Sequence, residues 1–185
     1  MASPGQNGIV RWWSQDSPAG ELFVAATALG VCLVEWGQPE RGVDPVERLA
    51  GLGRPVRERV AELADRWDAY AAGDRNALFD LPVDLTLAGT AFRKEVLAEL
   101  KRLPPGETVT YGELASRVGR PGGAQAVGGA VGANPVPVVV PCHRVMAADG
   151  SLGGFSGGLA TKRALLSHEG LFVPEGGWVA SHRDD

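Results

Sequence analysis

The sequence predicts an α+β protein in which a small α/β domain is followed by a helical domain with a helix-turn-helix. Three observations carry this prediction. Short runs rich in β-branched residues come first, helical periodicity dominates from about residue 90 onward, and two short helical segments there are joined by a glycine-bearing break. We place the domains at residues 1–85 and 86–175, followed by a tail at 176–185.

The first domain begins with three β-prone runs, which are Ile9 to Trp13, Glu21 to Thr27 and Val31 to Trp36. Turn signals separate them at Ser17-Pro18-Ala19-Gly20 and at Leu29-Gly30. Pro55 then opens a helical pattern whose apolar positions are Val56, Val60, Leu63 and Trp67, and Gly73 is expected to end it. The pattern breaks between Leu81 and Gly89, where we expect the domain boundary.

The second domain opens with a helix for which Thr90 is a plausible N-cap. One face of this helix carries Phe92, Val96, Leu97, Leu100 and Leu103, and Pro104-Pro105-Gly106 ends it. A second short helix is expected over 110–118. After the break at 119–123, a third runs from about Ala124 to Ala133.

This third helix contains three glycines, each of which costs about 1 kcal/mol of helix stability relative to alanine. Small side chains allow another surface to approach the helix backbone closely. That surface is either a neighbouring part of the protein or the groove of a nucleic acid, and the pattern alone leaves both open.

The run from Val136 to Val140 is apolar and β-branched, so we expect a buried strand or extended segment that ends just before Cys142. A Gly/Ser-rich loop follows at 150–158. The last helix is expected from Leu159 to His168, with Gly170 in the position that ends a helix with a left-handed residue.

Composition excludes several classes of protein. Hydrophobic residues make up 44% of the 185 positions and charged residues 22%, which is typical of a globular protein. We find no apolar stretch of transmembrane length and no secretory leader, and the two cysteines are far apart, so we expect a cytoplasmic chain with free thiols, away from membranes. No metal-ligand spacing occurs, so neither a metal nor another cofactor is expected.

The net charge of −4 argues against a nucleic-acid partner, but the charge is unevenly distributed. Residues 91–145 carry seven Lys or Arg and four Asp or Glu. This basic segment ends at Cys142 and His143. A local excess of +3 is weak evidence alone, because solvated helical faces often have one.

Cys142 and His143 raise the question of nucleophilic chemistry. A thiol needs a base to become a thiolate at neutral pH, and the base needs a third group to orient it, for which Glu169 is a candidate. Neighbouring side chains point in opposite directions in an extended chain, so contact requires a turn or a bridging water. A small buried cysteine without reactivity is the alternative, and it is the interpretation we give to Cys32 in its predicted strand.

The sequence "VPVVVPCHRV", preceded by "ANP" and followed by "GGFSGGLATKRALLSHEG", resembles the active-site region of the methylated-DNA-protein cysteine methyltransferases, also called O6-alkylguanine-DNA alkyltransferases. "GTAFRKEVLAELKRLPPGETVTYGELA", "AVGGAVGANP", "DSPAGEL" and "LPVDL" extend the resemblance over roughly residues 12 to 172. It implies a ribonuclease-H-like fold for the first domain and a winged-type helix-turn-helix in the second.

The resemblance implies DNA repair by direct, stoichiometric and irreversible transfer of the alkyl group from O6-alkylguanine, and also from O4-alkylthymine, to Cys142. His143 resembles the base that deprotonates the thiol through a water, and Glu169 resembles the carboxylate that holds His143. Asn134 resembles the residue that ties the recognition helix to the active-site loop.

The resemblance also implies which residues bind the base. Tyr111 resembles the phenol that contacts the flipped base and its phosphate. Phe155 stands where the family often has tyrosine, as a wall of the pocket. The backbone of Ser156, followed by Gly157, would meet O6, and the carbonyl groups of Cys142 and Val145 would accept hydrogen bonds from the guanine amine.

The implied partner is double-stranded DNA, bound by a monomer through the minor groove with the alkylated guanine flipped out. Ala126, Gly128, Gly129 and Gly132 would lie against the groove. Gln125 departs from the family, which typically has an arginine there to fill the gap left by the flipped base. We therefore expect weaker DNA binding or slower flipping, with Arg120 or Arg117 as candidates for the missing charge.

Three alternatives compete with alkyl transfer. Alkyltransferase-like proteins bind the lesion without transfer, but they replace the cysteine and generally lack the first domain. A plain helix-turn-helix regulator would need neither "PCHRV" nor Glu169. A cysteine hydrolase would need an oxyanion side chain, which the small residues of the loop do not supply. The zinc site of some family members should be absent, because Cys32 is the one cysteine of the first domain and no histidine precedes His143.

Overall fold

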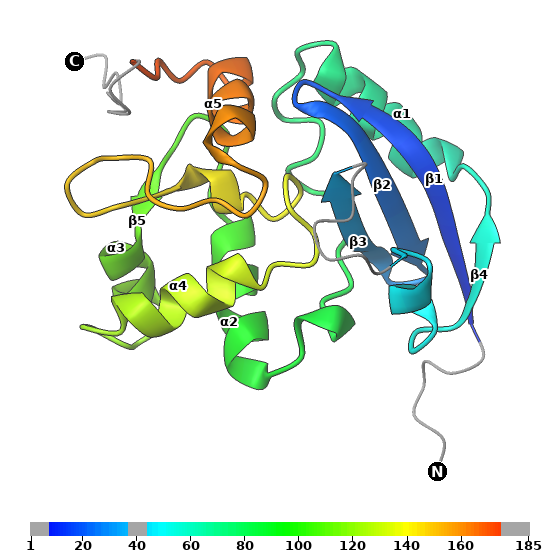
Figure 1. Cartoon of the computed structure of the whole chain (residues 1–185), viewed down its shortest axis with the longest axis horizontal. Helices are drawn as coiled ribbons and strands as arrows, with labels where there is room; N and C mark the ends of the chain where they lie inside the picture. The colour runs from blue at the N-terminus through cyan, green and yellow to red at the C-terminus, as the bar shows by residue number, and fades with distance from the viewer. Residues whose placement is uncertain (1–7, 37–43, 175–185) are drawn as a thin grey trace.

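The computed structural model describes residues 8–36 and 44–174, so the predicted tail at 176–185 lies outside the described residues. Within these ranges the chain has two sheets and five α-helices, which confirms the mixed α+β class. Figure 1 shows the larger sheet with α1 (Ala61–Ala71) on one side of the molecule and helices α2 to α5 gathered on the other.

The larger sheet is built from the three predicted strands and a fourth. β1 (Ile9–Ser17), β2 (Gly20–Thr27) and β3 (Gly30–Trp36) are antiparallel, and the order is β3-β2-β1-β4. β1 runs to Ser17, four residues beyond the prediction, because the two-residue turn before Gly20 keeps the chain paired to its end.

The prediction of a helix from Pro55 is wrong. Residues Arg54–Arg57 form the edge strand β4, in which Pro55 pairs with Val10 of β1 in parallel register. Proline has no N–H group to donate, and an edge strand tolerates this on its free side. Helix α1 begins only at Ala61, and Gly73, at φ 110°, follows its end as predicted.

The outer edge of β3 is covered by two later segments, one from each predicted domain. The Val31 N–H donates to the carbonyl of Pro82, in the first domain, at 3.0 Å, and the Val34 N–H donates to the carbonyl of Pro135, in the second, at 2.9 Å. A single hydrophobic core also includes buried side chains from both halves, such as Trp67, Leu97 and Val139. The two halves are thus packed together, and the division at residue 85 stays a prediction.

The helices of the second half follow the predicted pattern. They are α2 (Ala91–Lys101), α3 (Tyr111–Arg117) and α4 (Ala124–Gly132), with short 3-10 turns earlier at Glu47–Leu49 and Thr86–Ala88. Thr90 caps α2 by accepting from the Arg93 N–H at 3.3 Å, as predicted. α3 begins with a capping box between Thr110 and Glu113, which was not among the predictions.

The prediction of a strand or extended segment over Val136 to Val140 is wrong, although its burial is confirmed. The segment is a turn in which the Val140 N–H donates to the Val136 carbonyl at 2.9 Å and Val138 has φ 71°. The Asn134 side chain explains this shape. It accepts from the Val136 N–H at 3.0 Å and donates to the Val140 carbonyl at 2.9 Å, which supplies bonds that a sheet would otherwise provide.

The turn leads into a 3-10 turn at Cys142–Arg144 and then into β6 (Val145–Met146). β6 pairs in parallel with β5 (Val109–Thr110), which directly precedes α3. This pairing brings Tyr111, the first residue of α3, toward the segment that carries Cys142.

The last helix, α5 (Leu159–His168), ends as predicted. Gly170 has φ 86°, the Gly170 N–H donates to the Ser167 carbonyl, and the Leu171 N–H donates to the Leu166 carbonyl, both at 3.0 Å. This is a Schellman ending, which requires a residue such as glycine in the left-handed conformation. It leaves Glu169 at the C-cap, facing the body of the protein with 1% of its surface exposed.

Candidate active site

Cys142 lies on the wall of a pocket of about 220 Å³. The volume is roughly that of seven water molecules at about 30 Å³ each, which suits one planar base. Besides Cys142, the pocket is lined by residues from α3, α4 and the loop after β6, namely Tyr111, Gly128, Val131, Gly132, Gly154, Phe155 and Ser156. The thiol therefore shares a pocket with three of the residues predicted to bind the base.

His143, which follows Cys142 in the chain, forms a buried pair with Glu169. The His143 Nε2 atom lies 2.9 Å from Glu169 Oε1, and the two side chains are 0% and 1% exposed. A carboxylate only accepts hydrogen bonds, so Nε2 carries the proton and Nδ1 presents its lone pair. Nδ1 is buried and makes no hydrogen bond within the described part of the chain. The 3-10 turn that begins at Cys142 is the departure from extended backbone that contact between thiol and imidazole requires.

Arg144 holds the same carboxylate from a second direction. Its Nε donates to Glu169 Oε2 at 2.7 Å and its Nη2 donates to Oε1 at 2.8 Å. Its Nη1 donates to the Leu103 carbonyl at 2.6 Å. Burial alone would raise the pKa of Glu169, but His143 and Arg144 outweigh it and lower that pKa to about 2.

Burial also controls the protonation of the reacting groups. It raises the pKa of the Cys142 thiol, although the Asn134 side chain and the charge of Lys162 act in the opposite direction. It lowers the pKa of His143 despite the neighbouring Glu169. At neutral pH Cys142 is therefore a thiol and His143 a neutral imidazole, so the imidazole is able to accept a proton.

Sequence reasoning missed Lys162, which lies on α5 and is 0% exposed. Its Nζ donates to the Val145 carbonyl at 2.6 Å and also to the Leu152 carbonyl. Burial lowers its pKa to about 8, against the attraction of Cys142. No sequence signal marks it, because lysine on a helix is normally solvated.

Asn134 connects α4 to the active-site segment, as the resemblance implied. It lies two residues beyond Gly132, and its hydrogen bonds to Val136 and Val140 close the turn that precedes Cys142. These bonds join the end of α4 to the segment that carries the thiol.

Two of the predicted base-binding residues do not line the pocket. Val145 is fully buried, and its carbonyl accepts from Lys162. Gly157 lies beside the Phe155 ring, where an added Cβ would come within 3.0 Å of that ring and 3.2 Å of Trp36. Trp36 in turn packs edge-on against Phe155, with ring centroids 5.8 Å apart, so β3 supports one wall of the pocket.

The glycine-rich helix α4 presents an open surface. Gln125, Ala126, Gly129 and Gly132 are exposed and Gly128 is partly buried. A Cβ added at Gly129 or Gly132 would meet nothing within 4 Å, and one at Gly128 would make ordinary contact with the Tyr111 ring. Packing within the protein does not require the small residues at Gly129 and Gly132, and this favours the nucleic-acid interpretation over the close approach of a neighbouring element.

Arg120 is exposed at the break between α3 and α4, with its guanidinium 5.4 Å from the centre of the Phe92 ring.

Cys32 is fully buried in β3, where burial raises the pKa of its thiol to about 12. Over residues 8–36 and 44–174, no three His, Cys, Asp or Glu side chains are grouped so as to hold a metal ion. Among the described helices, none is long and apolar enough to cross a bilayer.

Comparison with known proteins gives consistent results. Residues 91–171 match the family model described as 6-O-methylguanine DNA methyltransferase, DNA binding domain. The chain is 49% identical to the methylated-DNA–protein-cysteine methyltransferase of Mycobacterium tuberculosis over 166 residues, covering 90% of this chain and 96% of that one. It is 38% identical to the protein of the same name from Shigella flexneri over 162 residues, covering 85% of this chain and 94% of that one.

Comparison with solved structures gives the same family. The crystal structure of Mycobacterium tuberculosis OGT in complex with DNA superposes with a TM-score of 0.70 at 36% identity, covering 87% of this chain and 92% of that one. The O6-methylguanine-DNA methyltransferase of Pyrococcus kodakaraensis gives a TM-score of 0.64 at 27% identity, covering 87% of this chain and 99% of that one. The fold is thus similar to those of proteins from both a bacterium and a hyperthermophilic archaeon.

Proposed function

The chain belongs to the family of methylated-DNA–protein-cysteine methyltransferases, and we propose that Cys142 is the residue that accepts the alkyl group. The protein repairs DNA by taking an alkyl group directly from the damaged base onto itself. The observation that carries the assignment of Cys142 is its position on the pocket wall, next to an imidazole anchored by Glu169. Cys32 is fully buried in a strand and does not line this pocket.

The reaction begins with removal of the thiol proton. The lone pair of His143 Nδ1 is the acceptor, and the proton reaches it through a bridging water. Glu169, held ionised by Arg144, stabilises the imidazolium that forms. Asn134 and Lys162 favour the thiolate, so the cost of forming it in a buried site is reduced.

The thiolate sulfur then attacks the saturated carbon attached to O6 of guanine. A sulfur–carbon bond forms, the carbon–oxygen bond breaks, and the bonding electrons pass to O6. Guanine recovers a proton, so that over the whole reaction the thiol hydrogen is exchanged for the alkyl group. A thioether has no easy route back to a thiolate, and each molecule is therefore consumed by one lesion.

The pocket residues bind the base. Tyr111 and Phe155 offer ring surfaces on which the base stacks, and Ser156 offers a backbone N–H group to O6. The carbonyl of Val145 has a second lone pair beyond the one used by Lys162, but Val145 is buried outside the pocket, so its predicted bond with the guanine amine requires the neighbouring loop to move. Gly157 keeps the Phe155 ring in place, since any side chain there would crowd it. O4-alkylthymine presents a similar alkylated oxygen and is a second substrate.

The partner is DNA, which agrees with the DNA complex of the similar mycobacterial protein. We infer that α4 enters the minor groove, with the damaged base turned out of the helix into the pocket and Gln125 in the space that it leaves. The open surface over Ala126, Gly129 and Gly132, next to the pocket, supports this placement. The ribonuclease-H-like and winged helix-turn-helix descriptions, the monomer and the cytoplasmic location stay predictions.

The test is an intact-mass measurement after incubation with a duplex that contains one O6-methylguanine. Wild type gains the mass of one methylene, and Cys142→Ser gains none while still binding the duplex. Cys32→Ser is the matched control and gains the same mass as wild type. A wild type that binds the lesion without any gain in mass would be a lesion-binding protein, and the proposal for Cys142 would be wrong.

A further inference from the structure

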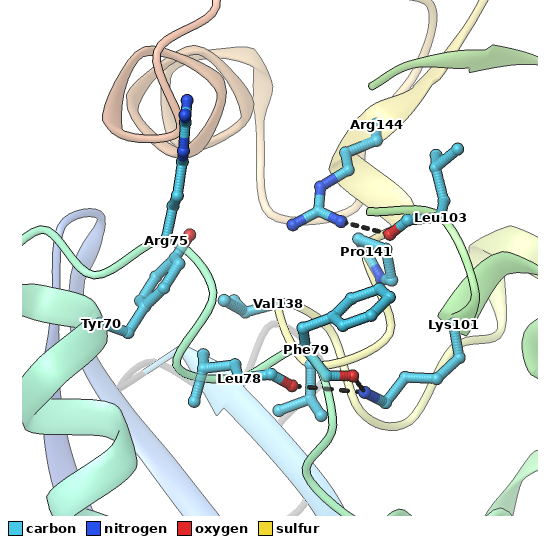
Figure 2. A pocket seen from close by; sticks show the side chains of 10 residues that line it. Tyr70, Arg75, Leu78, Phe79, Lys101, Leu103, Val138, Pro141 and Arg144 are labelled. Carbon is cyan, nitrogen blue, oxygen red and sulfur yellow. Dashed lines mark hydrogen bonds between the residues drawn. The ribbon is translucent and has the colours of Figure 1, made fainter. Parts of the chain in front are cut away.

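Tyr70 reaches the active site from the first half of the chain. It lies near the end of α1, is 1% exposed, and its hydroxyl group donates to Glu169 Oε1 at 3.1 Å. Figure 2 shows Tyr70 and Arg144 on opposite sides of a cavity of about 10 Å³, which Pro141 also lines. Cys142 lines the larger pocket instead, so the segment that carries the thiol lies between the two.

The ring of Tyr70 is held firmly. It meets the His168 ring edge-on with centroids 4.9 Å apart, and the Trp67 ring edge-on at 6.5 Å. The Tyr70 carbonyl accepts from His168 Nε2 at 2.6 Å, and Arg75 Nη1 donates to the Glu169 carbonyl at 3.3 Å. The end of α1 thus binds the end of α5 at the residue that holds His143.

Glu169 Oε1 accepts from three donors, which are the Tyr70 hydroxyl, His143 Nε2 and Arg144 Nη2. The Tyr70 hydroxyl therefore bonds to the same carboxylate oxygen that holds the His143 ring. We propose that Tyr70 is a positioning residue for alkyl transfer, which sets both the place of the Glu169 carboxylate and the basicity of His143. This inference rests on the function proposed above.

The direction in which Tyr70 changes the basicity of His143 follows from the groups around that imidazole. Glu169 contacts it directly, and Arg144 from its own turn and Lys162 from α5 act on it electrostatically. Tyr70 and Arg75 bond to Glu169, and His168 bonds to the Tyr70 carbonyl. A hydrogen bond from Tyr70 withdraws charge from the carboxylate and so weakens its attraction for an imidazolium. Without that bond His143 becomes a stronger base and is protonated at a higher pH.

The test is the pH profile of Tyr70→Phe, which keeps the ring and removes the hydroxyl. We measure the single-turnover rate of methyl transfer from an O6-methylguanine duplex between about pH 5 and 9. The acidic limb is expected to move up by about half a pH unit, so the rate falls by up to about threefold at pH values below the limb and is unchanged well above it. Alkylation of Cys142 by iodoacetamide, followed by mass, should show the same shift without DNA.

A fluorinated tyrosine at position 70 provides the opposite change. Fluorine next to the hydroxyl makes the phenol a stronger donor while ring and hydroxyl are both retained, so the acidic limb should move down. A purely structural role for Tyr70 does not predict shifts of opposite sign. This variant also keeps the inference testable if Tyr70→Phe folds poorly.

Leu33→Ala is the control for a loss of stability alone. Leu33 is fully buried in β3 and belongs to a different hydrophobic cluster from Tyr70. This variant should lose stability without any shift of the limb. The inference is overturned if the Tyr70→Phe limb coincides with wild type, or if Leu33→Ala shifts it equally. A wild type that fails to gain a methylene overturns the proposed function instead.

Discussion

Glu169 Oε1 lies 2.9 Å from His143 Nε2, and the two residues are 26 positions apart in the chain. The contact depends on two local features, the 3-10 turn at Cys142–Arg144 and the Schellman ending of α5. Arg144 completes the arrangement by binding both carboxylate oxygens. The proposed base is therefore held by a buried ion pair, so its chemistry and the stability of the fold depend on the same carboxylate.

Glu169→Gln should impair both alkyl transfer and the stability of the fold. The amide keeps the shape but removes the charge, so the buried Arg144 loses its counter-ion, at a cost of about 3 kcal/mol in the free energy of unfolding. The imidazolium of His143 is no longer stabilised, and transfer should slow by roughly 10- to 100-fold. Urea unfolding and single-turnover kinetics measure the two effects. Glu95→Gln, an exposed change on α2, should alter neither, and an unimpaired Glu169→Gln would contradict the proposed relay.

Stability should fall as the pH is lowered. The folded pKa of Glu169 is about 2, below its ordinary value of 4.5, so the carboxylate contributes stability above about pH 4.5 that is lost as the pH falls toward 2. The contribution is about 3 kcal/mol at most. The pKa of His143 is also lowered, so its contribution begins to fall below its ordinary value of 6.5. Urea midpoints measured against pH should decline through both ranges, and in Glu169→Gln the decline below pH 4.5 should be smaller.

Gln125→Arg should strengthen DNA binding. Gln125 is exposed at the start of α4, where an added positive charge reaches phosphates without being buried. We expect tighter binding at low salt and a steeper salt dependence, with the slope of log K against log salt changing by about one. Titration of a labelled duplex at several salt concentrations measures this. The same affinity and the same repair rate as wild type would show that Gln125 does not limit the reaction.

Gly129→Ala should separate stability from DNA binding. The new Cβ meets nothing within 4 Å, and alanine favours a helix over glycine by about 1 kcal/mol, so the free energy of unfolding should rise. The methyl group would stand on the surface that we place in the minor groove, so duplex affinity should fall. Gly112→Ala on α3 is the control, since its Cβ also meets nothing, and it should gain stability with a smaller loss of affinity. Undiminished binding by Gly129→Ala would contradict the placement of α4.

Much of the fold could be predicted because its signals are local. The three antiparallel strands, the Thr90 cap and the glycine that ends α5 each depend on residues that are near one another in the sequence. The two errors arose where a local pattern fits two structures. Pro55 suits the start of a helix and also an edge strand, and the pairing with β1 decided between them. The run from Val136 to Val140 is apolar in either conformation, and Asn134 made it a turn.

The sequence by itself determined the family and so the type of chemistry. The resemblance around Cys142 predicted the roles of the thiol, the imidazole and the carboxylate, and the glycines of α4 predicted a surface that another part of the protein or a nucleic acid approaches closely. Only the tertiary structure decided which charged and polar groups surround them. Tyr70 lies 99 positions from Glu169, and Lys162 and Arg144 belong to types that are normally solvated. Their burial depends on hydrogen bonds between distant segments, and a local pattern carries no information about such partners.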